Sequence, residues 1–415
     1  MAMRSIELFA GAGGLALGSA KAGFRHEAVL DWDPNACQTI RRNKRARLRD
    51  VRDWEVVEGD VRQYDFRKHR ESVEVIFGGP PCQPFSLGGK HRGSEDERNM
   101  FPEAVRAVRE ICPRAFVFEN VKGLLRRSFS NYFNYIVNQL RFPTVGRRGD
   151  EEWTDHQSRL EAIYAANQFS DLHYKVMPKL LNAADFGVPQ RRERVFMVGV
   201  RSDVHAEFSF PDPTHEEDAL LYDKWVSGEY WDRHKVPRKQ REPIPARLAN
   251  RVEALQALWK PMLRKPWRTV RDAIHDLPGI AIGETSQKVA NHWFNPGARS
   301  YAGHNGSPLD EPAKTLKAGD HGVPGGENTL RLQDGWVRYF SVRECARLQT
   351  FPDSWILEGS WTECMRQLGN AVPVRVGEVV ARKLARVLFA ADANTQLGRE
   401  RASVASCSSD PRKAG

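Results

Sequence analysis

The chain lacks long hydrophobic runs. No stretch approaches the roughly 18 consecutive apolar residues that span a bilayer, and the mean hydropathy is −0.57. The first residues include an acid, Glu7, and no long apolar core, so they do not have the pattern of a secretory signal. We therefore expect no contact with a membrane and no export, which places the protein in the cytoplasm.

Cysteine is also scarce, with six residues among 415. None of the six belongs to a Cys-x-x-Cys pair or to a Cys/His cluster at the spacing of a zinc site. Because a reducing compartment keeps thiols free, we expect free cysteines and no metal. The 32 Gly and 24 Pro show no collagen-like period, and 40% hydrophobic residues suffice for the cores of two or three domains.

Positive charge, in contrast, is abundant. The 63 Lys and Arg outnumber the 53 Asp and Glu, which gives a net charge of +10. Such a balance favours a polyanionic partner, although ribosomal and membrane-surface proteins share it. The densest basic run is Arg41 to Arg49. Runs of this kind on surface helices are mostly solvated faces, and a phosphate contact is the alternative.

The first two hundred residues alternate short β-branched runs with helical patterns, which is typical of βαβ units and a parallel sheet. Ligands of such sheets bind at the loops after the carboxyl ends of the strands. Helical spacing predicts helices over 34–47, 102–111, 342–349 and 374–388. The expected strands are Ile6–Leu8, Ala28–Leu30, Val73–Phe77, Ala115–Phe118, Val176–Leu181 and Val195–Val200.

The alternation stops near Glu207, where Trp, Pro and basic residues crowd together. One amphipathic helix is expected there, at 247–259, and the helical pattern resumes after Ser341. Residues 144–167 look like an insertion, for which no role can be deduced. The predicted divisions are a first lobe at 1–206, a second and mostly irregular domain at 207–337, a return to the first lobe at 338–390 and a disordered tail at 391–415.

A glycine-rich loop, Phe9 to Gly14, follows the first strand and opens a helix. Its glycines let the backbone approach a bound ligand at a positive helix terminus, although alone they also fit a dinucleotide fingerprint or a plain strand-turn-helix. Asp31, about 20 residues on, can hold ribose hydroxyls in either case, and Trp32 can cover an adenine face. Asp60, after a further expected strand, is a candidate acceptor for the adenine amino group.

Cys82 stands in a rigid loop, Pro80-Pro81-Cys82-Gln83-Pro84, after the β run that ends at Phe77. The prolines fix the backbone around a thiol at the carboxyl end of a strand, so we expect the loop to present Cys82 instead of burying it as an inert thiol. As a nucleophile, it would need nearby donors or positive charge to stabilise its thiolate. Glu119 ends the following strand and places a carboxyl group at the same rim, though a rim Glu can also be a helix N-terminal charge.

Three donors alternate along the segment that enters the last expected strand. Gln190, Arg192 and Arg194 share one face, because side chains two residues apart in a strand point the same way. Such a face suits a phosphate or a base carbonyl, and a surface strand of salt bridges is the alternative.

These pieces, in this order, resemble the cytosine C5 DNA methyltransferases of bacterial restriction-modification systems. The resemblance covers roughly residues 4–205 and 338–390. Two departures stand out: Asp31 occupies a position where the family more often has Glu, and the segment 98–102 looks one residue short of the family's fifth motif. The six motifs that carry the resemblance are Phe9 to Gly14, Pro80-Pro81-Cys82-Gln83, Glu119-Asn120-Val121, Gln190-x-Arg192-x-Arg194, Arg343 to Asp353 and Gln367 to Pro373.

The resemblance implies an α/β fold with a Rossmann-like sheet, S-adenosylmethionine as methyl donor, no metal, and duplex DNA as partner. It also implies a nucleoid-associated bacterial protein and leaves open a companion restriction endonuclease that acts independently. The implied cofactor pocket consists of Phe9, Gly11, Gly13, Asp31, Trp32, Asp60, Val61 and Asn370. The implied substrate contacts are Gln190, Arg194 and a landmark of the target-recognition domain, Thr315-Leu316.

The resemblance further implies a mechanism. Cys82 would add to C6 of a flipped-out cytosine, while Glu119 would protonate or hydrogen-bond N3. Arg192 would hold the base carbonyl or a phosphate and help to keep Cys82 ionised. After methylation of C5, loss of its proton and elimination of the thiolate would release the product.

Three alternatives stay open at this point. A nicotinamide-dependent oxidoreductase would use the same first loop but would not need the Pro-Pro-Cys and Glu-Asn-Val motifs. A related RNA cytosine C5 methyltransferase would share the catalytic motifs, but usually with a shorter recognition region than 207–337. A non-catalytic DNA-binding module would not need Cys82 and Glu119.

Overall fold

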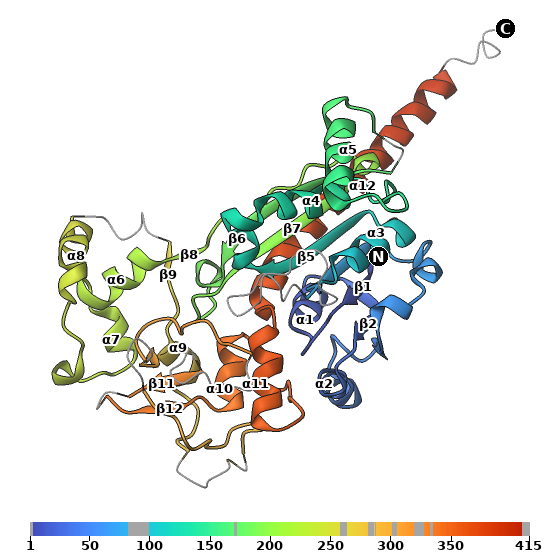
Figure 1. The fold of residues 1–415 in the computed structure, drawn as a ribbon. Helices are drawn as coiled ribbons and strands as arrows, with labels where there is room; N and C mark the ends of the chain where they lie inside the picture. Colours follow the sequence, from blue (N-terminus) through green and yellow to red (C-terminus); the bar gives the residue numbers. More distant parts are fainter. Residues whose placement is uncertain are drawn as a thin grey trace.

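The computed structural model describes residues 3–81, 99–169, 172–257, 264–280, 286, 288–300, 305–318, 328–332 and 335–408, with side chains described as far as 397. Figure 1 shows two lobes, a larger one around a seven-stranded sheet and a smaller one that holds α6 to α11. Among the helices in the described ranges, none has both the length and the apolar character needed to cross a membrane.

The larger lobe is an α/β fold whose sheet has the order β3-β2-β1-β4-β5-β7-β6. Because β2 and β3 lie on one side of β1 and the later strands on the other, the strand order reverses between β1 and β4. Ligands of α/β sheets bind at such a switch point, beyond the carboxyl ends of the strands. The strands are β1 (Arg4–Leu8), β2 (Arg25–Asp31), β3 (Glu55–Glu58), β4 (Val75–Gly78), β5 (Ala115–Val121), β6 (Tyr174–Asn182) and β7 (Glu193–Arg201).

The six strands listed from the sequence are confirmed, but the prediction that the sheet is parallel is wrong. β7 runs antiparallel to both of its neighbours, β5 and β6. Residues 183–192 join β6 to β7 and contain only a short 3-10 turn, Ala183–Phe186. This connection is too short for the crossover that a parallel neighbour requires.

Helices cover both faces of the sheet. On one face, α3 (Phe101–Ile111), α4 (Ser130–Arg141) and α5 (Trp153–Ala165) share a buried apolar cluster with the strands. On the other face lie α1 (Gly14–Lys21) and α12 (Val374–Ser408), which pack against each other although they are far apart in the sequence.

Two glycines allow this close approach of α1 and α12. A Cβ added at Gly14 would lie 2.2 Å from the carbonyl oxygen of Val372, and one added at Gly18 would lie 2.5 Å from that of Val374. Since backbone atoms cannot move aside cheaply, α1 accepts the start of α12 only because these positions lack a side chain.

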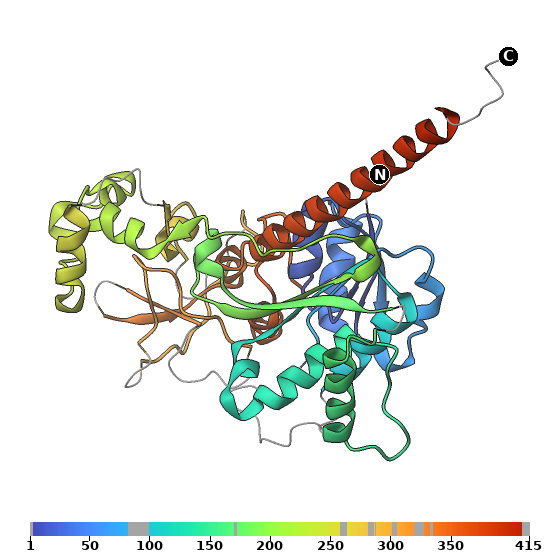
Figure 2. The same cartoon turned by 90° about the horizontal axis from the view of Figure 1, so that it is seen from above.

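The disordered tail predicted at 391–415 is wrong for most of its length, because α12 continues to Ser408. Ala391 is buried, and Asp392 forms an ion pair with Arg114. The sequence has no proline between Pro373 and Pro411, so nothing in the backbone ends the helix earlier. Figure 2 shows the last turns of α12 projecting beyond the sheet.

The insertion-like stretch 144–167 contains α5, which packs against α4. His156 lies within hydrogen-bonding distance of the Tyr135 hydroxyl (2.9 Å) and of the Val145 carbonyl oxygen (2.8 Å), and Leu160 is fully buried. The insertion therefore adds a helix to the face of the sheet that α3 and α4 cover.

The smaller lobe contains short helices and strands joined by irregular segments, as expected. The predicted helix at 247–259 is present as α8, with Val252 and Leu255 buried. The division expected between 337 and 338 falls inside β12, whose ends pair with β11, so it cannot separate two domains. The elements are β8 (His215–Glu216), α6 (Glu217–Trp225), α7 (Glu229–Arg233), α8 (Ala249–Gln256), β9 (Lys265–Pro266), α9 (Val270–Ile274), β10 (Ser307–Pro308), β11 (Thr329–Arg331), β12 (Val337–Tyr339), α10 (Val342–Leu348) and α11 (Trp361–Asn370).

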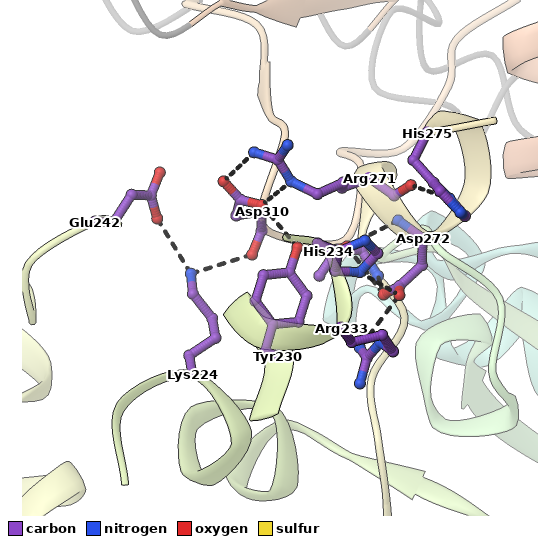
Figure 3. A network of polar contacts seen from close by, with 10 residues as sticks. Lys224, Tyr230, Arg233, His234, Glu242, Arg271, Asp272, His275 and Asp310 are labelled. Carbon is purple, nitrogen blue, oxygen red and sulfur yellow. Dashed lines mark hydrogen bonds and ion pairs between the residues drawn. The ribbon is translucent and has the colours of Figure 1, made fainter. Parts of the chain in front are cut away.

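A buried polar network fixes α6 and α7 against the segment around Asp310 (Figure 3). The Asp310 carboxylate accepts hydrogen bonds from the Tyr230 hydroxyl at 2.7 Å and from Arg271 Nε at 2.6 Å. Lys224, which is almost fully buried, donates to the Asp310 carbonyl oxygen and to Glu242, each at 3.1 Å. Because buried charges need such partners, this network holds the helices to the segment that leads into Thr315.

Candidate active site

The loops that follow β1 and β4 lie next to each other at the switch point of the sheet. Leu8, the last residue of β1, pairs with Gly78, the last residue of β4, and Gly78 in turn pairs with Phe118 of β5. The glycine-rich loop, the Pro-Pro-Cys loop and Glu119 therefore share one edge, as the sequence predicted.

Asp31 shapes the glycine-rich loop. Its carboxylate accepts hydrogen bonds from the Gly11 amide at 2.7 Å and from the Asp33 amide at 2.9 Å, and burial raises its pKa. Phe9, Gly11 and Gly13 all have positive φ. Glycine adopts this backbone conformation most easily, and it occupies two of the three positions. A Cβ added at Gly11 would meet no atom within 4 Å, so this part of the loop borders open space.

The residues expected to hold the adenosine group surround this loop. Trp32 is 78% exposed, which leaves a ring face free for stacking. Asp60 caps the short turn Val61–Gln63 and forms an ion pair with Arg62. Val61 is buried, and Asn370 is exposed at the end of α11.

This donor set fits S-adenosylmethionine. It offers a carboxylate at the ribose position, a free indole face for the adenine and a bare glycine for close approach of the ligand. Phe9 and Gly13 belong to the same turn, so all the predicted cofactor residues from the first two loops fall at one edge of the sheet.

Cys82 lies outside the described residues, but both ends of its loop are described. The Asn120 side-chain amide donates to the Pro80 carbonyl oxygen at 2.8 Å, and the Met100 amide donates to the Pro81 carbonyl oxygen at 3.1 Å. The loop therefore leaves and rejoins the lobe at one point beside β5. Asn120 has a positioning role that the sequence did not assign to it, although its place directly after Glu119 in an alternating strand offered a signal.

Glu119 is nearly buried, at 6% exposure, and lies beside the start of that loop. A Cβ added at Gly79 would be 3.6 Å from Glu119 Oε2, and Arg194 Nε is 2.9 Å from Glu119 Oε1. Burial raises the pKa of Glu119, while the positive charges of Arg194 and Arg192 oppose this increase.

The two arginines have different surroundings. Val121 pairs with Arg194 across β5 and β7, which makes Arg194 the diagonal neighbour of Glu119. Arg192 precedes β7 and is fully buried, where its guanidinium donates to the carbonyl oxygens of Leu316 (3.0 Å), Gly369 (2.6 Å) and Ala371 (3.0 Å). The guanidinium beside Glu119 is therefore that of Arg194. The expectation that Arg192 holds the base carbonyl or a phosphate does not fit its buried position.

Gln190 and the Thr315-Leu316 pair connect the two lobes. Gln190 is fully buried, accepts a hydrogen bond from the Leu316 amide at 3.0 Å and donates to the Leu348 carbonyl oxygen at 3.3 Å. The Thr315 hydroxyl donates to the Arg191 carbonyl oxygen at 2.7 Å. The expected substrate contacts of Gln190 and Leu316 do not fit these positions, because both side chains are occupied or buried at the contact between the lobes.

Among the described residues, no group of three or more His, Cys, Asp and Glu side chains is arranged to hold a metal ion.

The chain matches a family model described as C-5 cytosine-specific DNA methylase over residues 3–142 and 153–386. The interruption lies at the start of the insertion that contains α5. The type II methyltransferase M.Eco47II of Escherichia coli is 34% identical over 386 residues, covering 92% of this chain and 79% of that protein. The type II methyltransferase M.NgoMIV of Neisseria gonorrhoeae is 32% identical over 392 residues, covering 94% of this chain and 99% of that protein.

Two solved structures share the fold. A DNA modification methyltransferase encoded within an Escherichia coli prophage matches with a TM-score of 0.51 at 23% identity. A DNMT2 mutant of Spodoptera frugiperda matches with a TM-score of 0.55 at 16% identity, and each match covers 93% of this chain and 99% of the other. The family match and the two relatives agree with the site at the switch point. The chain belongs to the C-5 cytosine-specific DNA methylase family and is an S-adenosylmethionine-dependent DNA cytosine C5 methyltransferase.

Proposed function

We propose that the enzyme methylates a cytosine that it flips out of a specific duplex sequence, through a covalent bond between Cys82 Sγ and C6 of the base. The observation that carries this proposal is the buried pair of Glu119 and Arg194 beside Gly79, where the Cys82 loop begins. C6 is inaccessible in a stacked duplex, so the base must leave the helix to reach this pair.

Cys82 supplies the nucleophile. Its thiolate adds to C6, and the electron pair of the C5–C6 double bond moves to C5, which becomes nucleophilic. When bound, S-adenosylmethionine offers a sulfonium methyl group for C5. A base then removes the C5 proton, and the C5–C6 double bond re-forms as the thiolate leaves.

Three of the four described cysteines fit this role poorly. Burial raises the pKa of the Cys37 and Cys364 thiols to about 12 and raises that of Cys345 as well. These thiols therefore stay protonated at neutral pH, whereas a nucleophile must reach the thiolate form.

Glu119 and Arg194 act on the base. As C6 is attacked, negative charge develops on the ring, and a protonated Glu119 can donate to N3 to neutralise it. Burial favours that protonated carboxyl group. Arg194 is placed to hold Glu119 and to donate to the base carbonyl, whereas Arg192 and Gln190 position the contact between the lobes.

We further propose that the enzyme serves a restriction-modification system in a bacterial cytoplasm, next to an endonuclease that acts independently on the same sequence. The support for this is the similarity to two proteins named as type II methyltransferases.

Bisulfite sequencing of a plasmid carrying the gene tests the proposed function. We expect every copy of one short sequence to carry 5-methylcytosine, and we expect none in cells that express Cys82→Ala. Methylation of cytosines regardless of their surroundings would contradict the proposed specificity, and an unmethylated plasmid with methylated RNA would identify a different substrate.

A further inference from the structure

A cluster of cations lies beside β3, the strand at one edge of the sheet. α2 (Pro34–Arg45) begins beside Trp32, where Asp33 caps it, and ends in basic residues. Its 12 residues rise by about 18 Å. The chain then turns and enters β3 at Glu55, which is the amino end of that strand, so the basic end of α2 lies far from the carboxyl edge that carries Glu119.

This region contains a shallow, open depression of about 800 Å³, which we call the rear hollow. Five of the six residues that line it are cations, and the sixth is a single carboxylate. The lining residues are Arg41, Lys44, Arg45, Arg47, Arg52 and Asp53.

Some of these cations have partners within the protein, which hold them in place. Arg41 pairs with Glu58, and Lys44 donates to the Trp54 carbonyl oxygen at 2.6 Å. Arg52 lies 3.6 Å from Asp53. The walls of the hollow are therefore ordered by contacts to the buried turn that precedes β3.

Arg45 and Arg47 differ from the other lining cations. Both are exposed, and the described part of the chain provides neither an ion pair nor a side-chain hydrogen bond for either of them. Arg47 has φ of 54°, at a helix end where glycine or asparagine is usual. Their charge is thus available at the mouth of the hollow.

We propose that the rear hollow binds the phosphates of a second DNA segment while the first occupies the active site. Guanidinium groups bind phosphates in bidentate fashion. The lining contains no aromatic side chain on which unpaired bases could stack, which favours the backbone of a duplex over a single strand. Because duplex DNA is stiff over about 150 bp, a short duplex in the active site cannot also reach the hollow.

Such a second site would let the enzyme pass between distant segments of a long DNA molecule. Non-specific binding of this kind is carried by phosphate contacts, and it weakens steeply with salt. The proposal does not depend on the role of Cys82, since it concerns a different edge of the lobe.

The test compares Arg45→Glu/Arg47→Glu with a control, Lys175→Glu/Arg386→Glu. Each pair changes two cations to acids, and the control residues lie on β6 at the far edge of the sheet and on α12. The probe is a fluorescent duplex of A·T pairs only, which offers no cytosine to the active site. At low salt, we expect two duplexes to bind each wild-type or control chain and one to bind the hollow variant. We also expect the slope of log affinity against log salt for the second duplex to reflect about two phosphate contacts, at roughly 0.9 each.

Methylation assays complete the test. The hollow variant should methylate a short cytosine-containing duplex at the wild-type rate and should methylate distant sites on a long plasmid more slowly than the control. Binding of two duplexes to the hollow variant would overturn the proposal. So would equal loss of the second duplex in the control, or loss of short-duplex methylation by the folded hollow variant. Absence of methylation by the wild-type chain would instead contradict the proposed function.

Discussion

Two buried carboxyl groups, Glu7 of β1 and Glu119 of β5, lie close to the active edge of the sheet. Burial raises the pKa of both. Glu119 has Arg194 beside it, whereas Glu7 Oε2 has no hydrogen-bond partner among the described residues and faces the negative charge of Asp31. Glu119 can therefore exchange its proton near a cation, whereas Glu7 is held as a neutral acid.

Arg194→Gln should move the alkaline limb of the pH profile to higher pH. The positive charge of Arg194 opposes the increase in the pKa of Glu119, so removing it raises this pKa further. Since the reaction needs protonated Glu119, activity should persist to higher pH even though its maximum falls. Single-turnover methylation measured against pH gives the midpoint.

Arg191→Gln is the matched control for this shift, because Arg191 is exposed and pairs with Glu217. An unchanged or lower midpoint in Arg194→Gln would argue against Glu119 as the proton donor.

Glu7→Gln should stabilise the protein increasingly as the pH rises above about 4.3, the ordinary pKa of a glutamate in the unfolded chain. In the folded wild type, Glu7 keeps its proton up to its raised pKa, so stability falls between these two values as the pH rises. Glutamine cannot ionise, and its advantage should grow by up to about 1.4 kcal/mol per pH unit within this window. Thermal unfolding from pH 4 to pH 8 measures it. A constant difference across this range would show that Glu7 is ionised in the folded state.

Lysine substitutions should separate the two arginines. Arg192→Lys removes the fork that serves three buried carbonyl oxygens, which should lower stability by about 1–3 kcal/mol. Arg194→Lys should leave stability close to that of the wild type and lower kcat. Chemical denaturation and single-turnover rates on both variants check this, and the reverse pattern would restore Arg192 to the base.

The sequence predicted which residues share the active edge, because the carboxyl ends of neighbouring strands must meet there. It did not distinguish Arg192 from Arg194, since alternation places both on one face and only the pairing of β7 with β5 decides which reaches Glu119.

At the scale of elements, α11 and the end of the recognition segment meet through a single glycine. A Cβ at Gly369 would lie 2.1 Å from the Ala318 amide nitrogen and 2.3 Å from the Lys317 carbonyl carbon. Both atoms belong to the backbone, so this contact fixes α11, and with it Asn370, against the segment that carries Leu316.

Gly369→Ala should therefore push the two segments apart. We expect a loss of roughly 1–3 kcal/mol in stability and weaker binding of S-adenosylmethionine through displacement of Asn370. Thermal unfolding and titration calorimetry measure these effects. Gly146→Ala is the control, because a Cβ there meets no atom within 4 Å. Identical behaviour of the two variants would show that the contact between the segments is soft.

Local patterns located many elements, but they gave no prediction for α4 to α7, α9 and α11, and they were wrong on two features. β-branched runs located the strands of the larger lobe, but the direction of β7 depends on the short connection 183–192. The apolar stripe located α12, but its polar continuation past Ala391 looked like a tail, because its composition is polar and small. Asp392 and Arg114, which form an ion pair, are 278 residues apart in the chain, so no local sequence pattern predicts their contact.

At the scale of the whole molecule, the enzyme consists of two lobes joined by segment 313–316 and by α12. Lys224 of α6 donates to the carbonyl oxygen of Asp310 (Figure 3). Further along the same segment, Thr315 and Leu316 contact Arg191 and Arg192 of the larger lobe. The loop that contains Cys82, the proposed nucleophile, begins at Pro80 and Pro81, whose carbonyl oxygens accept hydrogen bonds from Asn120 and Met100.

The covalent bond between Cys82 and the target base is the central claim, and trapping tests it most directly. DNA with 5-fluorocytosine at the methylated position should hold the enzyme after methyl transfer, because fluorine cannot leave as a proton and elimination stalls. The wild-type complex should survive denaturing electrophoresis and should require S-adenosylmethionine. Cys82→Ala should bind the same DNA without forming the complex, and Glu119→Gln should form it more slowly by a factor on the order of 100. Methylation by Cys82→Ala, or a trapped peptide that contains Cys37, Cys112 or Cys345, would contradict the account.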